Sequence, residues 1–269
     1  MILIDKDKCT SCGLCVTDCV STNIELVNDK ANVKRDTCLV CGHCIAICPE
    51  NAISTNVYPM EDVREYSEKD FAIEPEVLLN FIMFRRSVRH FKKEQVEDDI
   101  ILKIIEAGRF TATGSNRQKV SYIVVRENLA QLRRLFLEKI SETTLQQAQQ
   151  NPALASFAER WTNMLESDIV LPGKNDGIFY NAPAVILLVS DSTVDAALAA
   201  SNMELMAIAQ GLGVLYCGFF VRTALGNEKI SDLLGISVEQ EIKVCLVIGK
   251  PDVTYVRTVP RKTASVLWK

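Results

Sequence analysis

The stretch CTSCGLCVTDC, residues 9–19, places four cysteines within eleven residues. A second stretch, CLVCGHCIAIC at residues 38–48, has the same spacing, and each of its cysteines follows its counterpart by 29 positions. Eight of the ten cysteines of the chain therefore belong to two copies of one motif. Self-similarity at a fixed period indicates an internal structural repeat.

The spacing C-x2-C-x2-C-x3-C, followed by Pro49 in the second copy, is typical of iron–sulfur ligation. Two-residue gaps curl the backbone so that three thiolates converge on one [4Fe-4S] cluster, while the fourth cysteine points away and serves the other cluster. Val20 stands where the second copy has Pro49, which changes the turn and not a ligand. We therefore predict two ligand sets, Cys9, Cys12, Cys15 and Cys48 for one cluster and Cys19, Cys38, Cys41 and Cys44 for the other.

Zinc and disulfides are the alternatives for such dense cysteines. Zinc sites usually take two Cys-x-x-Cys pairs, without a third cysteine that continues each run. Disulfides are rare in the cytoplasm, where we expect this chain because MILIDKDKC lacks the pattern of a signal peptide. Residues 1–57 resemble a two-cluster ferredoxin over their whole length, and the polar stretch 58–76 is expected to be a linker.

The bulk composition excludes several classes of partner. The chain has 269 residues, 48% of them apolar, and a formal net charge of −4. An acidic balance argues against nucleic acid as the main partner, because phosphate binding needs a basic surface. No uninterrupted apolar run reaches the length of a membrane span, so a membrane partner is not expected either.

Residues 77–269 alternate between helical and strand patterns, which predicts an α+β domain. Gly108 is expected to follow the end of a helix that starts near Asp98 or Asp99. The run around 194–210 is apolar nearly all round, which predicts a helix buried centrally or between subunits. Cys245 lies in a predicted buried strand and is expected to be inert packing. Helices are expected at VLLNFIMF, DDIILKIIEAG, NLAQLRRLFLEKIS and PALASFAERWTNMLES, and strands at SYIVV, AVILLVS, VLYCGFF and IKVCLVIG.

Four further stretches carry residues suited to a ligand. They are RRSVRHF (85–91), TATGSNRQ (111–118), GLGVLYCGFF (211–220) and GKPDVTYVRTVPRK (249–262). Arginine forks match phosphate oxygens, Asn and Gln amides can read the edge of a flat heterocycle, and glycines permit close backbone approach. Taken singly, each stretch also fits a solvated surface or an ordinary loop.

In this order and spacing, the four stretches resemble the flavin-dependent nitroreductase family over essentially all of residues 77–269. The resemblance implies a mixed sheet flanked by helices, and an intertwined homodimer with FMN at the subunit interface. Lys119 and Val120 stand where many relatives carry Pro-Trp, and segment 142–181 fits the variable lid region of the family, so substrate choice does not transfer. The implied FMN contacts are Arg85, Arg86, Ser87, Arg89, Ser115, Asn116, Gln118, Cys217, Gly218, Arg261 and Lys262.

The whole chain resembles the ferredoxin-fused iron–sulfur nitroreductases of anaerobes. This implies an oxidoreductase in which two [4Fe-4S] clusters load FMN, which reduces a nitro or similar electron-poor small molecule, with reduced ferredoxin or NAD(P)H as donor. Arg89 is predicted to stabilise charge near flavin N1. No residue is assigned as a general acid, and His90 is expected to be structural. The alternatives are an electron-transfer module that serves a protein partner, and a quinone or alkene reductase.

Overall fold

The computed structural model describes residues 1–237 and 240–269. The chain divides into two compact units. The first unit comprises Met1–Glu74 with Thr113–Arg117, and the second comprises Pro75–Ala112 with Gln118–Lys269. The first boundary falls within the predicted linker 58–76, which also contains the short helices η1 (Met60–Asp62) and α3 (Glu68–Phe71).

Two small antiparallel sheets frame the first unit. Strand β1 (Ile2–Ile4) pairs with β4 (Ile53–Thr55), so the two ends of the cysteine-rich region lie side by side. Strands β2 (Ile24–Val27) and β3 (Lys30–Val33) form a hairpin. Its turn residues Asn28 and Asp29 have φ of 49° and 58°, which is the left-handed backbone that a tight hairpin turn needs.

The sequence repeat of the first unit is also a structural repeat. Helix α1 (Leu14–Asp18) follows Gly13 with φ of 76°, and helix α2 (His43–Ala46) follows Gly42 with φ of 78°. Glycine adopts this left-handed conformation without a steric penalty, so it can end each cysteine loop and start each helix.

A four-stranded sheet forms the centre of the second unit, in the order β5 (Ser121–Val125), β6 (Ala184–Val189), β8 (Ile242–Gly249) and β7 (Gly213–Tyr216). These strands pair antiparallel, while the isolated bridge between Ser87 and Val214 is parallel and makes the β7 edge mixed. The strand expected at VLYCGFF is shorter than predicted, because helix α9 (Gly218–Ala224) begins two residues after Tyr216.

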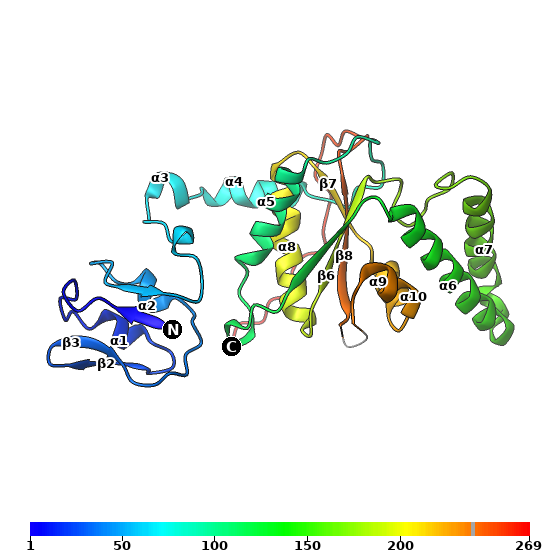
Figure 1. Ribbon diagram of the computed structural model, residues 1–269. Coiled ribbons are helices and arrows are strands. Elements are labelled where there is room, and N and C mark those ends of the chain that lie inside the picture. Colours follow the sequence, from blue (N-terminus) through cyan, green and yellow to red (C-terminus); the bar gives the residue numbers. More distant parts are fainter. Residues whose placement is uncertain (238–239) are drawn as a thin grey trace. The chain divides into compact units, whose positions relative to one another are not determined.

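Helices cover both faces of this sheet (Figure 1). On one face lie α5 (Asp98–Arg109) and α8 (Thr193–Ala209), which pack against Ile186 and Leu188 of β6. The other face packs Leu187 of β6 against residues of α6 (Leu129–Gln150), α7 (Ala155–Val170), α9 and α10 (Glu228–Leu234). Alternate residues of one strand thus serve two cores, as the two-residue period of a strand requires.

One expectation about the helices needs correction, namely the position of Gly108. Gly108 is the penultimate residue of α5 and does not follow its end. A Cβ there would be only 2.9 Å from the Met203 side chain of α8, so the glycine permits close packing of the two helices. Helix α8 packs one side in the core of the second unit, while Val194 and Leu198 are 67% and 48% exposed, so burial between subunits stays a prediction. None of the described helices combines the length and apolarity needed to cross a membrane.

Candidate functional site

The eight clustered cysteines line two cavities in the first unit. One is lined by Cys9, Cys12, Cys15 and Cys48, and the other by Cys19, Cys38, Cys41 and Cys44. This is the grouping that the spacing predicts, with the fourth cysteine of each run in the cavity of the other run. Among the described residues, no three His, Cys, Asp or Glu side chains form a site for a single metal ion.

Backbone N–H groups donate to cysteine sulfurs in both cavities. The donors at 3.2–3.4 Å are Asn23 to Cys19, Ala31 to Cys9, Val40 to Cys38, and Ala52 to Cys48. Hydrogen bonds of this kind stabilise negative charge on sulfur, and the bond from Ala31 lowers the pKa of Cys9. Burial raises the pKa of the Cys15 thiol and raises that of Cys44 to about 11. A soft all-thiolate donor set supported by N–H···S bonds fits iron–sulfur clusters.

The predicted flavin loop has a strained backbone. Ser115, Asn116 and Gln118 have φ of 53°, 53° and 50°, although none of them is glycine. Such conformations cost on the order of 1–3 kcal/mol each and persist where surrounding contacts hold them. In the first unit, the Asn116 side chain donates from Nδ2 to the carbonyls of Leu39 at 3.0 Å and Val40 at 2.9 Å.

The arginine-rich segment 85–91 lies along the β7 edge of the second unit. Val88 donates its N–H to the Val214 carbonyl at 3.0 Å, and the segment then continues beside residues 250–252. A Cβ on Gly213 would lie 2.7 Å from Val88, so only glycine allows this approach. The first and fourth predicted stretches therefore meet next to the strand that leads to Cys217.

Arg85 and Arg86 both have partners in the second unit. Arg85 Nη1 contacts the two carboxylate oxygens of Glu204 at 3.3 and 3.2 Å, and the Glu204 side chain is only 6% exposed. Arg86 donates to the Arg257 carbonyl at 2.7 Å, and its guanidinium lies 4.2 Å from the centre of the Tyr255 ring. Both contacts join residues more than 100 positions apart, so no local signal in the sequence could predict them.

The remaining predicted contacts of the second unit are accessible. Ser87, Arg89, Arg261 and Lys262 are exposed, the last two in the segment after β8.

Tyr216 adjoins Glu204, and burial together with the charge of Glu204 raises the pKa of this tyrosine.

Cys217 and Gly218 differ in what they offer a ligand. The Cys217 N–H donates to the Cys245 carbonyl at 2.8 Å, and its buried thiol donates to the Ile178 carbonyl at 3.6 Å. Gly218 is exposed, and the space where a Cβ would stand is open. Within the described residues, the Gly218 N–H has no acceptor, so it is the backbone donor available to a ligand here.

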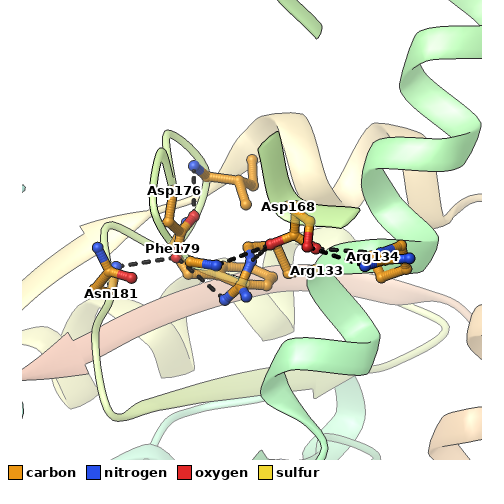
Figure 2. A network of polar contacts seen from close by, with 8 residues as sticks. Arg133, Arg134, Asp168, Asp176, Phe179 and Asn181 are labelled. Carbon is orange, nitrogen blue, oxygen red and sulfur yellow. Dashed lines mark hydrogen bonds and ion pairs between the residues drawn. The ribbon is translucent and has the colours of Figure 1, made fainter. Parts of the chain in front are cut away.

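Figure 2 shows a buried polar network that fastens the loop before β6. Asp168 of α7 accepts from Arg133 Nε at 2.8 Å and from Arg134 Nε at 3.2 Å. Arg133 also pairs with Asp176 at 3.6 Å, and Asp176 accepts the N–H groups of Ile178, Phe179 and Asn181. Because the Ile178 carbonyl accepts from the Cys217 thiol, this network fixes the surroundings of that cysteine. The sequence analysis did not predict the network.

Burial would raise the pKa of Asp168, but the N–H of Gly173 and the two guanidinium groups outweigh this effect and lower the pKa.

A cavity of about 500 Å³ also lies between α5, β5 and α10, and none of the predicted site residues lines it.

Comparison with known proteins identifies both parts of the chain. A model of the nitroreductase family matches residues 82–250, and a model of the 4Fe-4S dicluster domain matches residues 1–49. Among solved structures, a nitroreductase with bound FMN from Bacteroides fragilis is 18% identical, with a TM-score of 0.56, over 71% of this chain and 98% of its own. One with bound FMN from Desulfitobacterium hafniense is 23% identical, with a TM-score of 0.53, over 70% and 97%. A BluB-like flavoprotein from Clostridium difficile is 18% identical, with a TM-score of 0.54, over 71% and 96%.

Proposed function

The chain belongs to the nitroreductase family, and on that premise we propose that it is an FMN- and iron–sulfur-dependent oxidoreductase that reduces a nitro or similarly electron-poor small molecule. The observation that carries this proposal is the presence, in one chain, of two cysteine-lined cavities and a nitroreductase fold. Bound clusters would supply one-electron transfer, and bound FMN would combine single electrons into a two-electron reduction.

The eight cysteines would hold two [4Fe-4S] clusters, one in each cavity. The N–H···S bonds would stabilise the negative charge of the thiolates, and the iron would offset the burial that raises the pKa of Cys15 and Cys44. Clustered thiols reserved for metal suit a reducing cytoplasm. Reduced ferredoxin or NAD(P)H would be the electron donor.

In the second unit, FMN would be held by arginine side chains and one backbone amide. Arg85 uses only Nη1 for Glu204, and a guanidinium carries five N–H donors, so the rest of the fork suits a phosphate oxygen. Ser87 and Arg261, with Lys262, would add donors at the phosphate, and the Gly218 N–H would donate to the edge of the ring. Arg89 would stabilise negative charge on the reduced ring, and Arg86 would complete the clamp. Ser115, Asn116 and Gln118 would border the flavin from their loop.

A homodimer is supported by apolar surface that lacks cover in the described chain. Helix α4 (Pro75–Phe84) buries none of its residues, although Val77, Leu79 and Met83 are 59%, 50% and 48% exposed. The exposed Val194 and Leu198 of α8 add to this surface. Obligate interfaces bury roughly 2,000–5,000 Å² and resemble a core cut in half, which suits such helices.

Anaerobic purification followed by cofactor analysis and an acceptor panel tests the function. We expect iron, acid-labile sulfide and FMN, and turnover of nitroaromatic acceptors with reduced ferredoxin or NAD(P)H. Zinc in place of iron, or absence of flavin, would contradict the proposal. Reduction of a partner protein but of no small molecule would instead favour an electron-transfer module, and preference for quinones or activated alkenes would reassign the acceptor.

A further inference from the structure

Asn116 connects the predicted flavin loop to one of the two cysteine loops. Its Nδ2 donates to the carbonyls of Leu39 at 3.0 Å and Val40 at 2.9 Å, the two residues between Cys38 and Cys41. Two carbonyl acceptors require the NH2 side of the carboxamide, so both amide hydrogens point at the cysteine loop. Asn116 and the loop of Cys38 belong to the same compact unit.

The Leu39 carbonyl is part of the peptide group whose N–H belongs to Val40. That N–H donates to Cys38 Sγ at 3.3 Å. Asn116, the Leu39–Val40 peptide and the Cys38 sulfur therefore form one chain of hydrogen bonds. A carbonyl that accepts a hydrogen bond polarises its peptide and strengthens the bond that the N–H donates, by about 10–30%.

Hydrogen bonds to the sulfurs of an iron–sulfur cluster stabilise its more negative, reduced state and so help to set its reduction potential. We propose that Asn116 is a positioning residue that raises the reduction potential of the cluster bound by Cys19, Cys38, Cys41 and Cys44. The described contacts of Asn116 are with Leu39 and Val40 in the second copy of the motif, so the proposed effect concerns the cluster of that copy. This cluster would be the one that passes electrons to FMN, and in this respect the inference rests on the proposed function.

The strained loop supports this role. Ser115 and Asn116 both have φ of 53°, whereas the φ of 49° at Val40 recurs at its counterpart Ser11 (63°) and so belongs to the cysteine motif itself. The bonds from Asn116 to Leu39 and Val40 are contacts that help to fix the strained loop of Ser115 and Asn116. A cluster held by Cys19, Cys38, Cys41 and Cys44 with a raised potential would be the favoured electron acceptor of the two.

The size of the expected shift in reduction potential follows from the cooperative strengthening of the bond to Cys38 Sγ. A hydrogen bond to a charged sulfur strengthened by 10–30% changes the ratio of reduced to oxidised cluster at fixed potential by about twofold to fivefold once the direct dipole of the carboxamide is included. At 59 mV per tenfold change for one electron, this is a downward shift of about 20–40 mV when the donor is removed.

The test is an anaerobic redox titration of the full-length protein, followed by electron paramagnetic resonance. The variants are Asn116→Leu and Asn116→Ser, which remove both donated bonds. Asn175→Leu is the matched control, because the Asn175 carboxamide of the second unit donates to the Ser167 hydroxyl and not to a cysteine loop. Cys12→Ser and Cys41→Ser each alter one cluster and thus assign its signal.

We expect the reduction potential of the cluster bound by Cys41 to shift downward in both Asn116 variants. The potential of the other cluster, and both potentials in the Asn175 variant, should stay unchanged. Unchanged potentials, or equal shifts in both clusters, would overturn the proposal. Loss of that cluster from both Asn116 variants would show a purely structural role and would overturn it as well. FMN content is measured on the same samples, so a protein without flavin contradicts the proposed function and leaves the potentials to decide this inference.

Discussion

Replacing Arg85 with alanine should destabilise the second unit as well as weaken its hold on FMN. The change leaves the Glu204 carboxylate, 6% exposed, without its guanidinium partner. Removing one partner of a fully buried ion pair costs about 3–5 kcal/mol. Because the Arg85 side chain is 40% exposed, solvent screens the pair, and we expect a loss of about 1–3 kcal/mol.

Thermal unfolding of the apoprotein, followed through the melting of this unit, measures the loss. For 150–250 residues, each kcal/mol lowers Tm by about 2–4 °C, so Arg85→Ala should lower it by about 2–12 °C. Glu204→Gln removes the buried charge, so adding Arg85→Ala to that variant should cost clearly less. Lys250→Ala is the control, since Lys250 and Glu94 are 47% and 55% exposed and such pairs contribute about 0–1 kcal/mol.

The two predicted roles of Arg85, the ion pair with Glu204 and the phosphate contact, can be measured separately. FMN titration of the Glu204→Gln protein measures phosphate binding without the ion pair, and Arg85→Ala in that background should still weaken FMN roughly tenfold to a hundredfold. A double-mutant cycle with no coupling between Arg85 and Glu204 would refute the structural role, and unchanged FMN affinity would refute the phosphate contact.

Three further substitutions test other parts of the structure. Cys19→Ala should disturb the cluster predicted for the cavity of Cys38, Cys41 and Cys44, and iron analysis should show the other cluster more intact. Loss of only the other cluster would contradict the crosswise assignment. Asp168→Asn should lower the free energy of unfolding by about 3 kcal/mol at pH 7. Because folding lowers the pKa of Asp168, this contribution is present above about pH 4 and is lost in acid, so the denaturation curves of both proteins should converge there. Gly213→Ala should displace Val88, lower the free energy of unfolding by about 1–3 kcal/mol and thereby weaken FMN binding. Adding Val88→Ala should relieve this steric conflict.

The cysteine region was predictable because its geometry is local. The repeat of 29 positions sets the same glycine-led helix after each loop, at Gly13 and Gly42, and it groups the cysteines in the two cavities as the spacing suggests. The strands β5, β6 and β8 were likewise predicted, since short runs rich in branched apolar residues leave few alternatives.

Long-range contacts were not predictable from the sequence. Arg85 reads as a phosphate ligand, and only the fold brings it to Glu204, 119 positions away. Gly108 reads as a helix stop, and α5 ends one residue after it, but the sequence does not show the close approach of α8 at this position. Asn116 reads as part of a flavin loop, whereas its carboxamide reaches Leu39 and Val40. In each case the tertiary contact is one that no local pattern contains, and the flavin contacts of Arg85 and Asn116 stay predictions.

The central claim is that electrons pass from the clusters to FMN within one chain. Rapid anaerobic mixing of full-length protein with a reduced one-electron donor tests it most directly, when cluster and flavin absorbance are followed together. The account predicts that the clusters bleach first and that the flavin follows. Each cluster would take up one electron and FMN two, which makes roughly four electrons per chain. In Cys41→Ser, the flavin phase should slow markedly while FMN content stays unchanged. Flavin reduction that is as fast in this variant as in the unaltered protein would contradict the account, because the clusters would then lie outside the electron path.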